Sequence, residues 1–150
     1  MRFTSDDIGR AALCVRHRRL GRNVPLEVFG SGFGKAISVA ASVVKVPSGV
    51  LAIDEFDTSL HVGAQAHVVK FCLHAANRLN VQLFVSTHSL ETLDAFLDEY
   101  EATKGLCSGS GDLRVLQVKR AKGTTEVDNL DGDTAKRLRE EIGVDLRRTV

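Results

Sequence analysis

Features typical of membrane, exported and zinc-binding proteins are scarce in this sequence. Its longest apolar stretches are interrupted well short of the length that crosses a bilayer, and Asp6 and Asp7 stand where a signal peptide needs its apolar region. Cys14, Cys72 and Cys107 are odd in number and far from a CxxC spacing, which disfavours a disulfide framework and a zinc site. We therefore expect a cytoplasmic protein with reduced cysteines and no membrane partner.

An excess of charge of one sign is also lacking. The 20 Lys and Arg residues almost balance the 19 Asp and Glu residues, so the net charge of +1 does not argue for nucleic acid or membrane as an obligate partner. Residues 1–24 are locally basic, with six arginines against two aspartates, but no Phe, Tyr or Trp is interleaved with the arginine cluster over 16–22 for base stacking. We interpret them as a basic, partly helical lead-in segment with a solvated face. A phosphate-binding patch is the alternative, and it would use Arg16, Arg18 and Arg19.

Residues 25–150 alternate between strand and helix patterns, which indicates an α/β fold. The apolar run 50–53 and the segment 81–86 read as buried strands, the first of them buried on both faces of a parallel sheet. Between them, apolar residues recur at steps of three and four across 61–79, as on one face of a helix. A strand, a crossover helix and a second strand form a right-handed unit, so the two strands are predicted to be parallel neighbours.

The remaining elements are predicted from turn and capping signals. Residues 30–34 read as a glycine-rich turn before a helix over 34–46, and Ser89 reads as the cap of a further helix. Residues 105–111 read as a loop, and 113–119 with 124–127 as a hairpin. A last helix is predicted to begin at Asp133 or Thr134 and to end at Gly143.

Acidic and imidazole side chains directly follow the two predicted parallel strands. Asp54 and Glu55 come after the first strand, and His88 follows the second. Open α/β sheets bind ligands at this edge, and neighbouring strands lie only about 4.8 Å apart, so we expect the three side chains in one crevice. Each feature alone could be a strand that ends in solvent-exposed polar residues; together they favour a functional site.

Phosphoryl transfer needs groups of these kinds. It requires a carboxylate that holds magnesium, usually through water, a base or orienting group for the attacking water, and a polar contact to the terminal phosphate. Asp54 suits the first role, Glu55 the second and His88 the third.

Two segments resemble known ATPase motifs. VLAIDEFDTSLH (50–61) resembles the Walker B motif and D-loop of ABC-type P-loop ATPases, and VQLFVSTHSLE (81–91) resembles their switch-histidine segment. Within that superfamily the chain is most similar to the AAA-type, RecF- and SMC-like ATPases related to overcoming-lysogenisation-defect proteins. The resemblance implies a partial P-loop domain over residues 25–150, and it implies that Asp57 is the D-loop residue that faces the other protomer. The family more often has Asn-Gly where this chain has Asp57 and Thr58.

The glycine-rich segment FGSGFGK (29–35) resembles the degenerate signature motif of the same family. The resemblance implies that Ser31, Gly32 and the amides after them grip the γ-phosphate of a nucleotide bound to the opposite subunit. A damaged Walker A loop is a rival interpretation, but the pattern GxxxxGK[ST] would need glycine at Phe29 and a hydroxyl at Ala36. A plain glycine turn before a packed helix is the other alternative.

A Walker A loop and a glutamine loop, which family members carry upstream, are missing from these 150 residues. The chain is therefore expected to be a fragment, a split-gene product that pairs with a Walker A-bearing half, or a decayed remnant. The resemblance implies binding and hydrolysis of ATP with Mg²⁺, coupled to homodimerisation or to that half, and a role in DNA maintenance or phage defence. A non-catalytic interaction domain and a nucleic-acid-binding protein are the alternatives.

Two further groups could suggest metal binding. His67 and His74 share a helix face near Cys72, but their spacing is wider than metal ligands need. The segment 131–133 (Asp-Gly-Asp) is explained at least as well by a turn with a helix cap.

Overall fold

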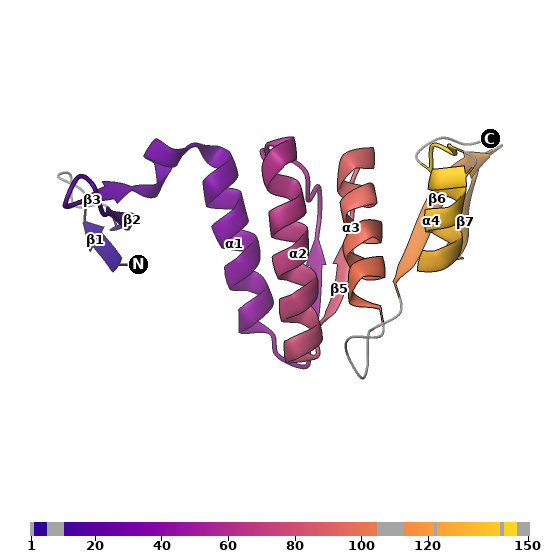
Figure 1. The fold of residues 1–150 in the computed structure, drawn as a ribbon, viewed down its shortest axis with the longest axis horizontal. Helices are drawn as coiled ribbons and strands as arrows, with labels where there is room; N and C mark the ends of the chain where they lie inside the picture. The colour runs from indigo at the N-terminus through magenta and orange to yellow at the C-terminus, as the bar shows by residue number, and fades with distance from the viewer. Residues whose placement is uncertain (1, 6–10, 105–112, 122, 142, 147–150) are drawn as a thin grey trace.

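The computed structural model describes residues 2–5, 11–104, 113–121, 123–141 and 143–146. The described elements form a row, with an antiparallel sheet at the N-terminal end, three helices side by side, and a hairpin with a helix at the C-terminal end (Figure 1). In chain order they are β1 (Arg2–Ser5), β2 (Ala11–His17), β3 (Arg22–Pro25), the 3-10 helix η1 (Leu26–Phe29), α1 (Ser31–Lys45), β4 (Val50–Ile53), α2 (Val62–Leu79), β5 (Gln82–Val85), α3 (Leu90–Thr103), β6 (Arg114–Ala121), β7 (Thr124–Asp131) and α4 (Gly132–Glu141).

Strands β4 and β5 are parallel neighbours, as the sequence predicted. Their register runs from Val50 opposite Gln82 to Ile53 opposite Val85, and α2 forms the crossover between them. Since the register is continuous to the last residue of each strand, the residues that follow β4 and β5 leave the sheet at the same edge. This edge is here called the carboxyl edge.

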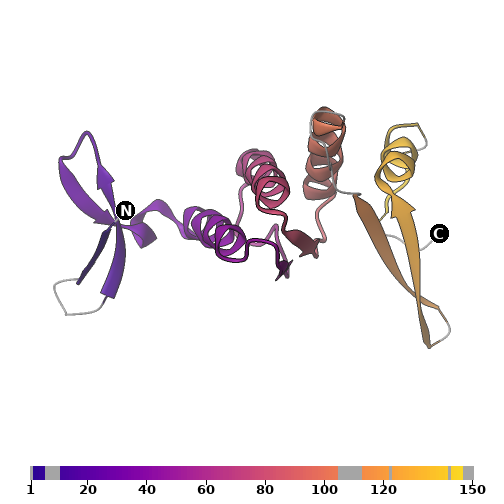
Figure 2. The same cartoon turned by 90° about the horizontal axis from the view of Figure 1, so that it is seen from below.

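The helices cover only one face of this two-stranded sheet. Figure 2 shows α1, α2 and α3 on the same side of β4 and β5. Alternate strand residues pack towards the helices (Leu51, Ile53, Leu83 and Val85), whereas Val50 and Phe84 on the other face are 61% and 48% exposed. The prediction that the first strand is buried on both faces is therefore wrong within this chain, because no described element covers the second face.

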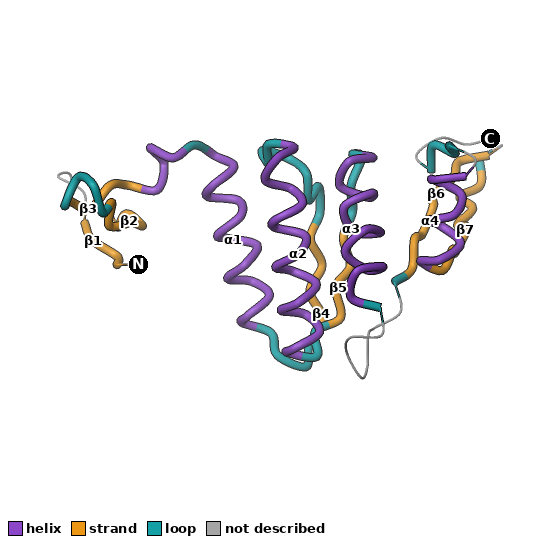
Figure 3. Tube along the Cα trace, viewed as in Figure 1, coloured by secondary structure: helices purple, strands orange, loops and turns teal. Residues whose placement is uncertain are grey.

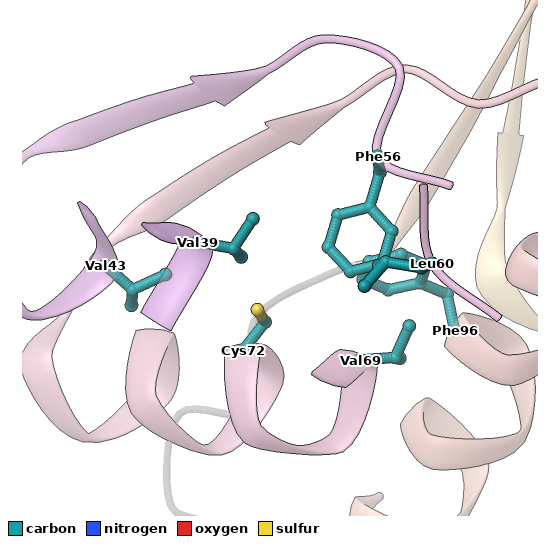
Figure 4. Packing of buried hydrophobic residues seen from close by; sticks show 7 residues of the cluster. All are labelled: Val39, Val43, Phe56, Leu60, Val69, Cys72 and Phe96. Carbon is teal, nitrogen blue, oxygen red and sulfur yellow. The ribbon is translucent and has the colours of Figure 1, made fainter. Parts of the chain in front are cut away.

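The main core lies between the helices and the helix-facing side of β4 and β5. Its buried residues come from α1, α2, α3 and the turn after β4 (Figure 4): Val39, Val43, Phe56, Leu60, Val69, Cys72 and Phe96. Phe56 is fully buried and meets Phe96 edge to face, with ring centroids 5.4 Å apart. Because Phe56 stands between Glu55 and Asp57, the core directly anchors the loop that carries the candidate site.

The N-terminal segment differs from its prediction. Instead of a partly helical lead-in, the described residues before η1 form strands and turns (Figure 3), and β1, β2 and β3 pair as an antiparallel sheet. The alternation of apolar and polar residues in β2 and β3 buries Cys14 and Val24, and the turn between the two strands uses Gly21 at φ +63°. The division of the chain at residue 24 stays a prediction.

The C-terminal hairpin is confirmed and is longer than predicted. Strands β6 and β7 pair from Arg114–Asp131 to Ala121–Thr124. Helix α4 begins at Gly132 rather than at Asp133 or Thr134, because Asp131 caps it: its carboxylate accepts bonds from the Thr134 amide (2.8 Å) and hydroxyl (2.9 Å). The loop predicted over 105–111 lies outside the described residues.

Side-chain caps fix where helices α2 and α3 begin. The Ser89 hydroxyl accepts a bond from the Thr92 amide (3.1 Å), which confirms the predicted cap of α3. At the start of α2, His61 Nδ1 accepts a bond from the Gly63 amide (3.1 Å). Within the described ranges, the structure contains no helix with the length and apolarity of a membrane span.

Replacing the core phenylalanine should test how strongly the core supports this loop. Phe56→Ala is expected to destabilise the fold by about 3–5 kcal/mol, because it removes a fully buried ring and leaves a cavity. Phe71→Ala, at a position that is 43% exposed on α2, should cost less than about 1 kcal/mol. Urea unfolding followed by circular dichroism measures both, and equal losses would contradict this account of the core.

Candidate functional site

Three helix N-termini and two strand ends meet at the carboxyl edge. Helices α2 and α3 start there because they follow β4 and β5, and α1 starts there because it ends where β4 begins (Figure 1). The first turns of helices present unpaired amides and a partial positive charge. The edge is therefore a favourable environment for an anionic ligand.

Ser86 joins the ends of the two strands. Its hydroxyl donates a hydrogen bond to the Asp54 carboxylate and accepts one from the Glu55 amide (2.9 Å). Backbone bonds continue the ladder beyond the strands, from Ser86 N–H to the Ile53 carbonyl and from Phe56 N–H to the Ser86 carbonyl, both 3.0 Å. The two acidic residues after β4 are thus fixed relative to the residues after β5.

Glu55 has an unusual backbone conformation. Its φ of +47° lies in the left-handed region, which is uncommon for a residue other than glycine and costs on the order of 1–3 kcal/mol. The conformation is held by three bonds: the Glu55 amide donates to Ser86, and the Glu55 carbonyl accepts from the Thr58 amide (3.1 Å) and from Lys35 Nζ (3.3 Å). The Glu55 side chain is exposed and accepts a bond from the Thr58 hydroxyl (3.3 Å).

Asp57 contacts the residues that follow β5. The Thr87 hydroxyl donates to the Asp57 carboxylate (2.5 Å), and the His88 backbone amide donates to it as well. Burial alone raises the pKa of Asp57, but these bonds, its own amide and the nearby His88 ring outweigh burial, so the pKa lies below its usual value. The carboxylate is therefore ionised at neutral pH.

The structure brings the predicted acids and the predicted histidine to one edge. Asp54, Glu55 and His88 are all exposed there, and the contacts that join the two strand ends pass through Ser86 and Thr87. The shared edge expected from parallel neighbouring strands is thus observed, and a crevice there and the chemical roles of the residues stay predictions.

The glycine-rich segment forms a helix start and not a separate turn. Gly30, at φ +85°, separates η1 from α1, which begins directly after it at Ser31, three residues earlier than predicted. Gly32 then packs against the turn after β4: a Cβ at this position would lie 2.4 Å from the Ser59 carbonyl oxygen. The predicted phosphate-binding residues Ser31 and Gly32 therefore lie beside the turn that follows Glu55.

Sequence reasoning missed three residues that organise the site. Ser86 and Thr87 lie in the segment 81–91 and were given no role of their own, although the register that places Val85 opposite Ile53 also places Ser86 opposite Asp54. Lys35 was considered only as part of a rival P-loop, although it lies one helical turn after Ser31. Hydroxyl residues directly after a buried parallel strand were the signal available in the sequence.

The residues considered for metal binding lie elsewhere and have other partners. His67 contacts the Gly63 carbonyl of its own helix (3.2 Å), and His74 contacts Glu99 on α3 (2.9 Å). Cys72 is in the core, where burial raises the pKa of its thiol to about 12. In the part of the chain that the structure describes, no group of three or more His, Cys, Asp or Glu residues could hold a metal ion.

Two glycines of α1 form a matched pair for testing the close approach of this helix to the turn. Gly32→Ala is expected to destabilise the fold by about 1–3 kcal/mol, because its methyl group would overlap the Ser59 carbonyl. Gly34→Ala should instead be neutral or stabilising by up to about 1 kcal/mol, because its methyl group would meet only Leu26, at 3.9 Å, and alanine favours helix. Urea unfolding measures both; a Gly32→Ala protein as stable as Gly34→Ala would contradict the packing.

Comparison with known proteins identifies the fold and the family. The sequence profile of the family described as "AAA domain, putative AbiEii toxin, Type IV TA system" matches residues 8–94. A solved structure from work on the ATP-driven dimerization and DNA-stimulated activation of SMC ATPases superposes with a TM-score of 0.53 at 15% identity, over 83% of this chain and 68% of that chain. The fold is thus similar to that of SMC ATPases.

Two proteins are similar in sequence. An uncharacterized protein of Methanocaldococcus jannaschii is 28% identical over 119 residues, which are 79% of this chain and 98% of that protein. An ATP/GTP phosphatase of Helicobacter pylori is 27% identical over 113 residues, which are 69% of this chain and 30% of that protein, so the chain matches less than a third of its length. The resemblance to ATPases is confirmed: the chain belongs to this AAA domain family and has the fold of a P-loop ATPase of ABC/SMC type.

Proposed function

We propose that the chain binds ATP with Mg²⁺ at the carboxyl edge of β4 and β5 and supplies catalytic groups for its hydrolysis. One observation supports this most strongly: Ser86 ties the Asp54–Glu55 pair to the strand end that carries His88. An acid pair and an imidazole are thereby held along one edge, beside three helix N-termini that favour phosphate.

The side chains at this edge suit magnesium. Mg²⁺ prefers oxygen ligands and keeps several waters, so a single carboxylate beside a hydroxyl is a fitting protein contribution. Asp54 accepts one bond from Ser86, and an ionised carboxylate has capacity for several more. In this proposal Asp54 holds the Mg²⁺ ion through a water molecule. ATP would supply the phosphoanhydride bond that is hydrolysed, and Mg²⁺ would neutralise the charge of the phosphates.

Glu55 and His88 have separate roles in the proposal. The Glu55 carboxylate, presented by the strained backbone at the end of β4, orients the attacking water and accepts its proton. His88 donates a hydrogen bond to the terminal phosphate. Ser31, Gly32 and the following amides of α1 bind the γ-phosphate of a nucleotide held by a second subunit, as the family resemblance implies.

In this proposal the phosphate cradle comes from other sequence. These 150 residues contain no GxxxxGK[ST] pattern, and backbone amides with a lysine are what hold the β- and γ-phosphates in P-loop ATPases. We propose that this cradle lies in the same longer polypeptide or in a second subunit. The SMC ATPases of the similar structure undergo ATP-driven dimerization, which supports a dimeric or paired state. We propose, as the family resemblance implies, that hydrolysis is coupled to work in DNA maintenance or phage defence; the matching family is described as "AAA domain, putative AbiEii toxin, Type IV TA system".

The proposal is tested at Glu55 with a matched glutamate on the hairpin. In protein purified from its native cells, so that any partner is retained, Glu55→Gln should lower ATP hydrolysis roughly 10²- to 10⁴-fold and leave ATP binding unchanged. Glu126→Gln, at an exposed position of β7, should change neither. Phosphate release and binding of a fluorescent ATP analogue are the measurements. Absence of ATP binding by the wild-type protein would favour the non-catalytic interaction domain instead.

A second candidate function, binding of single-stranded nucleic acid, is favoured by a surface that the sequence did not reveal. Phe29 from η1 and Phe33 from α1 are 38% and 42% exposed. The His17 ring stacks on Phe29 at 6.4 Å, and Phe29 contacts Phe33 at 5.3 Å. Exposed arginines surround His17 in β2, β3 and their turn: Arg16, Arg18, Arg19 and Arg22. Bases could stack on the aromatic rings while the arginines bind phosphates.

The dependence of binding on salt concentration distinguishes arginine–phosphate contacts from base stacking. Binding of a labelled oligo-dT strand, measured by fluorescence anisotropy, should weaken steeply with salt, and replacing Arg16, Arg18 and Arg19 by alanine should flatten the slope by about 0.7 per lost phosphate contact. Phe29→Ala should weaken binding by about 1–3 kcal/mol without changing the slope. Arg137→Ala and Phe71→Ala, at exposed positions on α4 and α2, are the controls. An affinity that does not change with salt concentration, or that is unchanged by the arginine substitutions, would rule this function out.

A further inference from the structure

We infer that Asp57 is a positioning residue that holds the His88 segment of its own chain, rather than a group reserved for contact with a second protomer. The inference rests on the proposed function for the phosphate contact of His88. It is carried by the geometry of the two turns that follow β4 and β5.

The Asp57 carboxylate connects three successive residues before α3. It accepts a hydrogen bond from the Thr87 hydroxyl (2.5 Å) and one from the His88 amide. The same Thr87 oxygen accepts a bond from the Ser89 amide (3.1 Å). The Thr87 hydroxyl therefore donates to Asp57 and accepts from the start of α3, and His88 lies between the residues that it joins.

Asp57 is itself held on both sides. Phe56 before it is fully buried against Phe96, and Leu60 after it is 6% exposed and donates its amide to the Asp57 carbonyl (3.0 Å). The carboxylate therefore stands on a turn that the core fixes at both ends. A supporting group on a fixed turn can hold an exposed neighbour in one orientation.

A buried bridge joins the same two parts of the chain. Gln65 Nε2 donates to the Leu60 carbonyl (3.2 Å), and Gln65 Oε1 accepts from the Thr92 hydroxyl (3.0 Å). Gln65 and Thr92 are 5% and 0% exposed, so these bonds are shielded from water. The turn after β4 and the first turn of α3 are thus joined by two buried hydrogen bonds, and Asp57 adds a further link from this turn to the His88 segment.

The charge of Asp57 fits this role. Its ionised carboxylate lies close enough to the His88 ring for an electrostatic interaction, and an ionised carboxylate can only accept hydrogen bonds, as it does from the Thr87 hydroxyl. A small displacement of a catalytic group can cost about 10²-fold in rate, so a support of this kind has a measurable effect on turnover.

The structural part of the inference is tested without nucleotide, by amide hydrogen exchange in NMR spectra. Asp57→Ala should accelerate exchange of the His88 amide roughly 10- to 100-fold, because a hydrogen bond to a charged acceptor is lost. Thr87→Ser, which keeps the hydroxyl, should exchange like the wild type. Asp128→Ala, which removes an exposed acid paired with Lys119 on the hairpin, is the matched control. An unchanged His88 exchange rate in Asp57→Ala overturns the inference.

The functional part is tested by a double-mutant cycle on ATP hydrolysis. Asp57→Ala is expected to lower kcat about 10²-fold with little change in KM, and to add little once His88→Ala is present, because both changes remove the same contact. Equal effects of Asp57→Ala in both backgrounds, together with weakened dimerisation, would assign Asp57 to the partner and overturn the inference. If the wild-type protein does not hydrolyse ATP, the proposed function fails and hydrogen exchange alone decides the role of Asp57.

Discussion

The arrangement of the candidate site depends on the parallel pairing of β4 with β5 and on its continuation through Ser86. A parallel ladder fixes which residues leave the sheet side by side. In this chain Asp54 and Ser86 leave together, and the Ser86 hydroxyl bonds both to the Asp54 carboxylate and to the Glu55 amide. A shift of the register by one residue would turn every helix-facing side chain to the open face and would separate the acids from His88.

The strained backbone at Glu55 is stabilised by its surroundings. A left-handed glutamate costs on the order of 1–3 kcal/mol, and full burial of the adjacent Phe56 ring contributes about the same amount in the opposite direction. Lys35 and Gly32 bring α1 against the same loop, so the first turn of this helix and the acids after β4 share one support. Strain and close packing thus occur together at the residues to which we assign the chemistry.

The open face of the β4–β5 sheet fits an ATPase domain that has further parts. Parallel sheets are normally covered on both faces, yet Val50 and Phe84 are largely exposed, and within the described residues β4 and β5 pair only with each other. The Helicobacter pylori relative is much longer than its matched region, whereas the Methanocaldococcus jannaschii relative is matched over nearly its whole length. The open sheet face and the greater length of the Helicobacter pylori relative support our proposal that the phosphate cradle is supplied by other sequence, either in one polypeptide or in a second one.

Local patterns in the sequence determined the central strand–helix–strand unit, the Ser89 cap, the hairpin and the acids and histidine at the strand ends. These features follow from apolar periodicity and from side-chain caps, which act between residues close together in the chain. Tertiary structure decided the rest. Strands β2 and β3 form because they pair with each other, and Phe29 reaches His17 only through that fold. The bond between Thr87 and Asp57 joins residues 30 positions apart, and contacts over such a separation leave no periodic signal in a single sequence.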